Sequence, residues 1–458
     1  MATRDLFQRT AEIASDYLES LEERPVRPEA TVEELRAALG GPLPEEPSDA
    51  RAVVEQLARD ADPGLMGIPS GRFFGFVMGG ALPASIAADW LTSAWGQNAG
   101  LLLSTPAASV VEEVAGGWLK DLLGLPQSAS FGLVTGGQMA HFTCLAAARH
   151  HLLAATGWDV ERDGLAGAPP IRVVAGANRH GTLDRALRFL GIGTAAIRPL
   201  RVDDQGRVFV DALREELGRS DGPTIACVQA GDINTGAFDD LEATADAARA
   251  AGAWLHVDGA IGLWAAASPS LRRLTAGMER ADSWVTDAHK LLSVPYDSGI
   301  ALCAHPDSHR AALGARAAYL LHADEAVGRD PVDFNPEHSR RARGFALYAA
   351  LRALGRTGVV ELVDRSHARA RSLAEGLAEL PGCEVLNDVV FNQVLVRFED
   401  DAVTDAVLAG VQASGEAWMS GTTRDGRKAI RLSVSNWQTS ERDVERTLAA
   451  FAAARMGR

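Results

Sequence analysis

Five short apolar runs, separated by alanine-rich segments, constrain the fold of this chain more than any other feature. The runs have the length of buried strands, and the segments between them have the length and composition of helices. Strands that alternate with helices are typical of an α/β layer, so we predict a mostly parallel central sheet with helices on both faces. The runs are 171–177, 223–230, 253–260, 283–287 and 299–304, and the helical segments include 138–153, 182–190, 209–218 and 240–251.

The regions on either side of these runs have different patterns. Residues 1–82 are polar and favour three short helices, too thin to enclose a core, so we expect an N-terminal helical arm that packs on another surface. Residues 83–345 contain the runs and are predicted to form the large α/β domain. Residues 346–458 are predicted to form a small C-terminal α+β domain.

The C-terminal region begins with a long helical pattern at 344–379, and Gly355 or Gly358 is the expected break in it. Shorter apolar and amphipathic segments follow, which predict strands and helices in turn. The predicted strands are 383–388, 392–399 and 428–435, and the predicted helices are 402–413 and 440–454.

Charge and cysteine usage exclude several classes of protein. Lys and Arg number 45 against 60 Asp and Glu, a net charge of −15, which argues against nucleic acid or an anionic membrane as the main partner. No stretch of 18 apolar residues is present, so we expect no membrane span. The four cysteines lie far apart, which predicts neither disulfides nor a metal site and favours a cytoplasmic location.

Two charged residues follow apolar runs and are the first candidates for chemistry. Lys290 comes just after the run 283–287, at the end of a strand where ligands bind in α/β sheets. Partial desolvation there would lower the pKa of its amine and make it nucleophilic. Asp258 ends the sequence WLHVD, 32 residues earlier. A carboxylate in that position needs a cationic partner, and a protonated pyridine nitrogen would serve.

Two further features complete a recognisable set. Gly136 and Gly137 lead directly into a helix that starts near Gln138, and backbone N–H groups at such a start bind phosphate. His180 lies between the run 171–177 and a helix, where a neutral imidazole can stack on an aromatic ring or act in acid–base catalysis. A phosphate cradle, a stacking histidine, a partner for a pyridine nitrogen and a nucleophilic lysine are the parts that a pyridoxal 5'-phosphate (PLP) enzyme needs.

The chain resembles the group II PLP-dependent amino acid decarboxylases, which include the aromatic L-amino acid, histidine and glutamate decarboxylases. The resemblance extends from about residue 72 through the long helix, and the spacing between HVD and DAHK is its most specific element. It implies the fold type I of PLP-dependent transferases (aspartate aminotransferase-like) and a homodimer. The matching segments are RFFGFVMGGALPASIAADWL, STPAASVVEEVAGGWLKDLLGLP, HGTLDRALRFLGIG, GDINTGAFDDL, WLHVDGA and DSWVTDAHKLL.

The resemblance also implies a role for each matching residue. Lys290 matches the Schiff-base lysine, Asp258 the partner of the pyridine nitrogen, and His180 the histidine stacked on the cofactor ring. Tyr319 matches the proton-donating tyrosine of the family's mobile catalytic loop, and Lys290, His180 and Tyr319 are thus the expected catalytic residues. The remaining cofactor-binding matches are Gly136, Gly137, Gln138, Asn234, Asp287 and His289.

Three segments depart from the commoner family pattern. Gln138 stands where Ser or Thr is frequent, and His141 follows in a stretch where the family often has Asn. The usual Gly-Thr-Thr is Gly-Asp-Ile at 231–233, and Gly-Ala-Ile at 259–261 replaces Ala-Ala-Tyr. These changes alter a hydroxyl contact to the cofactor and the shape of the pocket, and they leave the main candidate residues in place.

We expect decarboxylation of an L-amino acid to an amine and CO₂. Phe74, Phe76 and Met78 are the predicted substrate pocket and favour an aromatic or bulky side chain. Arg72 would instead pair with the carboxylate of an acidic substrate, Asp or Glu. Other possibilities are an aldehyde synthase, a lyase or a transaminase that uses the same site, and a non-catalytic scaffold with a degenerate site.

Overall fold

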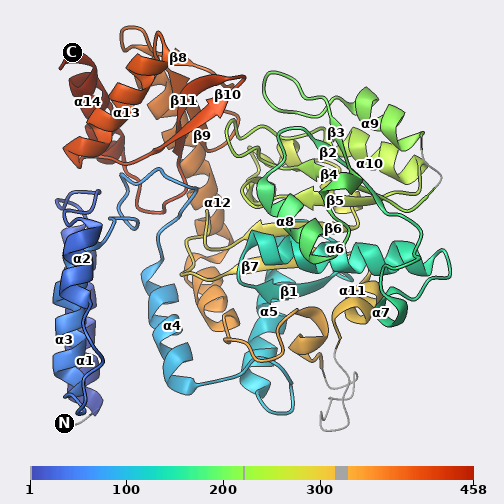
Figure 1. The fold of residues 1–458 in the computed structure, drawn as a ribbon, viewed down its shortest axis with the longest axis horizontal. Coiled ribbons are helices and arrows are strands. Elements are labelled where there is room, and N and C mark those ends of the chain that lie inside the picture. The colour runs from blue at the N-terminus through green and yellow to red at the C-terminus, as the bar shows by residue number, and fades with distance from the viewer. Residues whose placement is uncertain (1–2, 220–221, 315–327, 458) are drawn as a thin grey trace.

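The computed structural model describes residues 3–219, 222–314 and 328–457. A seven-stranded sheet lies at the centre, in the order β1-β7-β6-β5-β4-β2-β3. Figure 1 shows this sheet, with a second and smaller sheet near the C-terminus and a helical arm at the N-terminus. The strands of the large sheet are β1 (Ser130–Val134), β2 (Arg172–Gly176), β3 (Ile197–Leu200), β4 (Thr224–Gln229), β5 (Trp254–Asp258), β6 (Ser283–Asp287) and β7 (Gly299–Cys303).

Helices cover both faces of this sheet, because its strands are apolar on both sides. In β4, Ile225 and Cys227 pack with one helical layer, whereas Ala226 and Val228 pack with the opposite one. This alternation is the two-residue period of a strand buried on both faces. The first layer includes α6 (Gly137–Ala154) and α8 (Gly181–Phe189), and the second includes α5 (Pro106–Leu122), α9 (Val210–Leu217), α10 (Leu241–Ala250) and part of α12 (Gly344–Ala378).

The large sheet is mixed, with β7 antiparallel to both of its neighbours, β1 and β6. The other six strands run in one direction, which confirms the prediction of a mostly parallel sheet. The reason for the reversal is the short connection 288–298, since a parallel neighbour requires a crossover of a dozen or more residues. Lys290 therefore lies in the tight connection between two adjacent antiparallel strands.

The C-terminal elements form a second layer with its own apolar core. Its sheet is antiparallel, in the order β10-β11-β9-β8. The long helix α12 is interrupted at Gly355, one of the two expected break points. Its φ of 59° lies in the left-handed region, which glycine adopts readily. The remaining elements are β8 (Glu384–Val385), β9 (Gln393–Arg397), α13 (Asp401–Ser414), β10 (Ser420–Arg424), β11 (Arg427–Ser433) and α14 (Glu441–Met456).

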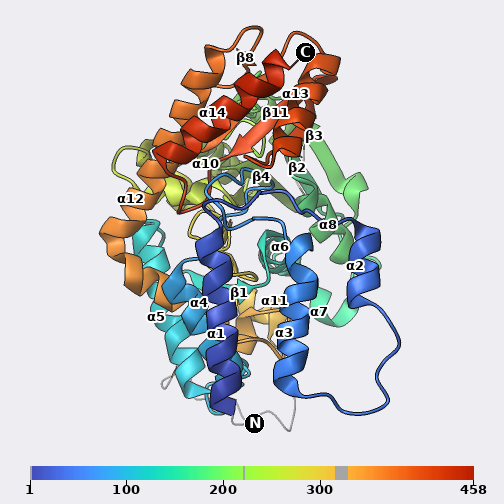
Figure 2. The ribbon, with the colours of Figure 1, turned by 90° about the vertical axis from the view of Figure 1, so that its left-hand side faces the viewer.

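The N-terminal arm contains no buried helical residue. Its helices are α1 (Thr3–Ser20), α2 (Val32–Leu39) and α3 (Ala50–Ala61), and none of them buries a side chain fully. Figure 2 shows α1 and α3 standing beside one another, in front of α4 (Pro83–Trp95) and the large sheet. Among the helices of the described residues, none is both long and apolar enough to cross a membrane. Two short helices complete the fold, α7 (Val160–Asp163) and α11 (Pro306–Leu313).

Arg340, just before α12, ties three parts of the large domain together. Its guanidinium donates to the carbonyl oxygens of Ala99 and Leu133 and to the carboxylate of Glu112, at 2.7 Å from Oε1. The side chains of Arg340 and Glu112 are each only 1% exposed. Removal of either partner would leave the other charge buried and unpaired, which is far more costly than the loss of a surface pair.

We expect Arg340→Met to lower the free energy of unfolding by about 3–5 kcal/mol. The neighbouring Arg341 pairs with Asp89 at the surface, and Arg341→Met is expected to cost under about 1 kcal/mol. Urea denaturation followed by circular dichroism measures both. Equal losses in the two variants would contradict the special role of the buried pair.

Candidate active site

A cavity of about 90 Å³ opens where three neighbouring strands of the large sheet end. Gln229, Asp258 and Asp287 are the last residues of β4, β5 and β6 and face this cavity together. The carboxyl ends of parallel strands are the usual location of ligand sites in α/β sheets. The lining residues are Gly137, Gln138, His141, His180, Thr182, Gln229, Gly231, Ile233, Asp258, Ala260, Ile261, Asp287 and Lys290.

Lys290 extends into the cavity from the connection between β6 and β7. Its Nζ lies 3.0 Å from Oδ2 of Asp287, and its side chain is 18% exposed. The backbone is held from two sides, because the Lys290 carbonyl accepts from the N–H of Ser293 at 3.1 Å and lies against Gly79. The amine is thus presented to the cavity on a fixed backbone.

Asp258 is a carboxylate surrounded by nitrogen atoms. Burial raises the pKa of Asp258, but the electrostatic interactions with His141, His180 and Lys290 and the hydrogen bond from His141 outweigh it, so the pKa is lowered overall. Oδ2 lies 3.3 Å from Nε2 of His141, and Oδ1 accepts the N–H of Ala260 at 3.2 Å. Asp258 is therefore ionised and stands ready to pair with a further cation.

His180 caps the N-terminus of α8 and lines the cavity. Its Nδ1 accepts the backbone N–H of Thr182 at 3.4 Å. Burial lowers the pKa of His180, and the electrostatic interactions with Lys290, His141 and Arg431 lower it further against the opposing effect of Asp258. The imidazole is consequently neutral, the form that can lie against an aromatic ring.

The N-terminus of α6 is a backbone cradle without a side-chain cap. Gly136 is its N-cap residue and offers no side-chain acceptor to the free N–H groups of the first turn. A Cβ on Gly137 would lie 2.9 Å from Oδ2 of Asp287, and one on Gly299 would lie 2.4 Å from the Cα of Gly136. Only glycines allow the backbone to approach this closely, and the exposed N–H groups suit an anion such as a phosphate.

Two polar atoms at the cavity are buried and lack a hydrogen-bond partner among the described residues. They are Nε2 of Gln229 and Oδ1 of Asp287. Such atoms are costly unless a ligand satisfies them. Together with an amine, an ionised carboxylate, a neutral imidazole and an uncapped helix start, they match the donor set for PLP, whose aldehyde, pyridine nitrogen, ring and phosphate need those partners.

Comparison with known proteins places the chain in a family. Residues 33–399 match the family described as "Pyridoxal-dependent decarboxylase conserved domain". The chain belongs to this family. It is therefore a PLP-dependent amino acid decarboxylase by family, a carboxy-lyase, and PLP is the cofactor of that family.

Its relatives differ in the substrates that they are named for. The chain is 27% identical to an aromatic-L-amino-acid decarboxylase of Bacillus atrophaeus, over 96% of this chain and 93% of that protein. It is 31% identical to an L-2,4-diaminobutyrate decarboxylase of Rhizobium meliloti (strain 1021), over 81% and 75% of the two chains. The crystal structure of Oryza sativa TDC with PLP and tryptamine superimposes with a TM-score of 0.92 at 24% identity, covering 99% and 97% of the chains. The expected fold type I is thereby confirmed.

Several features of this decarboxylase site were not predicted from its sequence. Gln229 ends an apolar run as Asp258 does, so the same signal could have found it. His141 lies three residues after Gln138, but only the fold shows that it pairs with Asp258. Arg431 is distant in sequence from the motifs, and only the fold brings its charge to bear on His180. Tyr296 stacks on the ring of His289 with centroids 4.3 Å apart.

His289 lies beside the cavity, and its side chain does not line it. Its Nδ1 accepts the N–H of Ser298 at 3.1 Å, and its Nε2 lies 3.6 Å from Oδ1 of Asp287. Burial lowers the pKa of His289. Its neutral ring thus lies beside Asp287, close to the cradle of Gly136 and Gly137.

Asn234 has a different position from the one expected at the cofactor's edge. Its Oδ1 accepts the hydroxyl of Thr422 in β10 at 3.0 Å, and its backbone N–H donates to Asp232 at 2.8 Å. Gly231 and Ile233 of the same turn line the cavity instead. The side chain of Asn234 links the turn to the small sheet.

The structure corrects the predicted substrate pocket. Arg72 is 1% exposed, and its guanidinium donates to the carbonyl oxygens of Leu21, Glu22, Arg24 and Glu416. It has no face left for a substrate carboxylate, so its predicted role in binding an acidic substrate is wrong. Phe74 is also 1% exposed and belongs to the core of the small sheet. Because its ring is buried in that core, its predicted place in the substrate pocket is wrong.

Phe76 and Met78 remain candidates for the pocket. Phe76 is 55% exposed, with its ring centroid 5.2 Å from that of Trp418, and Met78 is half-buried. The next residue, Gly79, is in contact with the backbone of Lys290, so this segment passes beside the site. Tyr319, the expected proton donor, lies outside the described residues.

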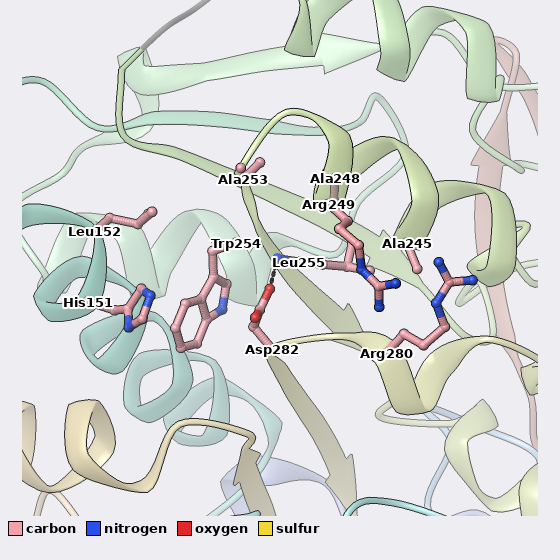
Figure 3. A pocket seen from close by; sticks show the side chains of 11 residues that line it. His151, Leu152, Ala245, Ala248, Arg249, Ala253, Trp254, Leu255, Arg280 and Asp282 are labelled. Carbon is pink, nitrogen blue, oxygen red and sulfur yellow. Dashed lines mark hydrogen bonds between the residues drawn. The ribbon is translucent and has the colours of Figure 1, made fainter. Parts of the chain in front are cut away.

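A larger cavity, of about 360 Å³, lies at the opposite end of β5 (Figure 3). Trp254, the first residue of β5, lines it beside His151, and Asp282 accepts the N–H of Leu255 at 2.7 Å. The other carboxylate oxygen of Asp282 lies 2.7 Å from Nε2 of His305. Its lining residues include no lysine, whereas Lys290 lines the smaller cavity.

We expect Gly79→Ala to disturb the site through the backbone. The added Cβ would lie 1.7 Å from the carbonyl oxygen of Lys290, which forces that connection to move. Such overpacking typically costs about 1–3 kcal/mol, so the melting temperature should fall. Gly117→Ala in α5 is the control, since its Cβ would meet nothing within 4 Å. A variant of Gly79 as stable as the wild type would contradict the contact.

Proposed function

We propose that this protein decarboxylates an L-amino acid to the corresponding amine, with Lys290, His180 and Tyr319 as catalytic residues. One observation carries the proposal: Lys290, Asp258 and His180 converge on one cavity beside the uncapped start of α6. The site belongs to a chain of the PLP-dependent decarboxylase family. Bound PLP would supply an electron-accepting ring for the bond to the departing carboxylate.

Each residue has a task set by its position. Lys290 attaches the cofactor through its amine, which the ion pair with Asp287 holds in place beforehand. Asp258 would keep a proton on the pyridine nitrogen, because a nearby carboxylate favours the cationic form of the ring. His180, as a neutral imidazole, would lie against the ring. Gly136, Gly137 and Gln138 hold the phosphate at the start of α6, with Asp287 and His289 behind them.

We propose an aromatic or bulky substrate side chain. The support is the exposed ring of Phe76 beside Trp418 and the half-buried Met78, next to the contact of Gly79 with Lys290. Because Arg72 is buried and both of its terminal NH2 groups donate to carbonyl oxygens, it no longer favours an acidic substrate. Tyr319 is proposed to return a proton to the substrate's α-carbon.

Mixing the purified, PLP-loaded protein with a panel of amino acids tests this function. We expect CO₂ and an amine from at least one aromatic or bulky member. Lys290→Ala should abolish turnover and change the visible absorbance of the bound cofactor, because the amine that attaches it is gone. Lys428→Ala, a surface lysine paired with Asp405, is the matched control and should behave as wild type. A colourless protein that binds no PLP, or release of aldehyde and ammonia in place of amine, would refute the proposed function.

We further propose a homodimer in the cytoplasm. The arm supports the first part, since its helices bury no residue and leave Phe7, Val53 and Leu57 49–58% exposed, as expected for a surface that a second copy covers. The four cysteines are all unpaired thiols, which supports a reducing compartment.

The double variant Val53→Asp, Leu57→Asp is expected to shift the protein from dimer to monomer, because it places charges on the apolar face of α3. Sedimentation equilibrium measures the shift. Met456→Asp, on α14 and 78% exposed, introduces the same charge at another apolar surface position and should leave the dimer intact. A wild-type monomer, or an unchanged dimer in the double variant, would rule out the arm as the interface.

A further inference from the structure

A chain of buried hydrogen bonds runs from Asp258 away from the cavity. Nε2 of His141 lies 3.3 Å from Oδ2 of Asp258, and Nδ1 of His141 lies 2.9 Å from Nε2 of His256. Nδ1 of His256 lies 2.8 Å from Oγ of Ser283, which accepts the indole N–H of Trp254 at 2.8 Å. His141, His256, Ser283 and Trp254 are each no more than 2% exposed, so water has no access to any link.

The fold explains why these side chains meet. Trp254, His256 and Asp258 alternate along β5 and therefore share one face of the sheet. Ser283 of β6 is the register partner of His256. Helix α6 packs over this face and places His141 between His256 and Asp258.

The two ends set the direction of the chain, because the ionised carboxylate of Asp258 can only accept and the indole N–H of Trp254 can only donate. Ser283 therefore accepts from the indole and has its own hydrogen available for Nδ1 of His256. His256 then donates from Nε2 to His141, and His141 donates from Nε2 to Asp258. Burial lowers the pKa of His256 to about 3, which keeps that ring neutral as this arrangement requires. Every hydrogen bond in the chain points toward Asp258.

We propose that His141 is a positioning residue for the pyridine nitrogen of PLP, acting through Asp258. With the N–H of His141 on Oδ2 and that of Ala260 on Oδ1, Asp258 is held ionised and oriented. Such a carboxylate holds a protonated pyridine nitrogen more strongly than an unsupported one. The inference rests on the proposed pairing of Asp258 with the cofactor.

Other ionisable groups surround this position and must stay unchanged in the test. His180 precedes α8, Lys290 follows β6, and Cys227 lies on β4, and each interacts electrostatically with Asp258. Among the described residues, the ionisable side chains that pair with His141 in this chain of hydrogen bonds are Asp258 and His256. Substitution of His141 by neutral amides leaves these residues and the glycines of the α6 cradle in place.

The test compares two amides at position 141 and two cofactors. The amide nitrogen of Asn superimposes on Nδ1 of histidine and that of Gln on Nε2, so only His141→Gln retains a donor near Asp258. The cofactors are PLP and an analogue in which C–H replaces the pyridine nitrogen. Fluorescence titration of the apoprotein measures both affinities without reference to activity.

We expect His141→Asn to bind PLP about tenfold more weakly than wild type, the usual effect of losing a hydrogen bond to a charged group. Its affinity for the analogue should not change, and His141→Gln should retain PLP affinity within about threefold of wild type. As a second measurement, Trp254→Phe removes the donor at the far end of the chain and should weaken PLP binding about two- to threefold, again without effect on the analogue.

The inference would be overturned if a variant lost affinity equally for PLP and for the analogue, because a merely structural role does not distinguish the two cofactors. It would also be overturned if either His141→Asn or Trp254→Phe lost no affinity for PLP. Failure of the proposed function gives a different result: the wild-type protein itself would then bind the two cofactors equally, or bind neither. Circular dichroism of each variant verifies that the fold is retained before the titration.

Discussion

The ionised carboxylate of Asp258 is the interaction on which this site depends. A buried carboxylate is costly, and here the cost is offset by His141, His180 and Lys290, which come from α6, from the residue before α8 and from the loop after β6. Three separate parts of the large domain must therefore be in place before the charge is stable. The same requirement brings together the amine, the imidazole and the helix start that PLP needs.

The reversal of β7 makes this convergence possible. The connection 288–298 is too short to cross over the sheet, so the chain turns back beside β6 and leaves Lys290 next to Asp287. Gly299 of β7 then lies directly against Gly136 at the start of α6. One antiparallel strand thus fixes both the lysine and the backbone cradle relative to the ends of β5 and β6.

Much of this arrangement was predictable from the sequence, because its signals are local. The strands of the core, the break at Gly355, and the candidates Lys290, Asp258 and His180 follow from apolar runs and from the polar residues that end them. Strands β1, β3 and β10 were not predicted. β1 contains Ser and Gly in five residues, and β10 is largely polar, so neither has a clear apolar period. The boundaries of the three predicted units stay predictions.

The failures in the substrate pocket have a different cause. Arg72 and Phe74 lie in an aromatic segment of the kind that lines substrate pockets, but the direction of each side chain depends on what packs around it. Arg72 is enclosed by carbonyl oxygens from the segment just after α1 and from Glu416, and Phe74 by the core of the small sheet. Residue type alone could not distinguish a guanidinium that binds a substrate from one that binds the backbone.

The sequence by itself determined the fold class, the cofactor chemistry and the main candidate residues, because strand periodicity and strand ends are encoded over a few neighbouring positions. Only the tertiary structure decided which partners those residues have. His141 and His256 are 115 positions apart, and Ser283 is 27 positions beyond His256. Their hydrogen bonds depend on the packing of α6 over β5 and β6, and burial and charge at such a distance in sequence are set by the whole fold.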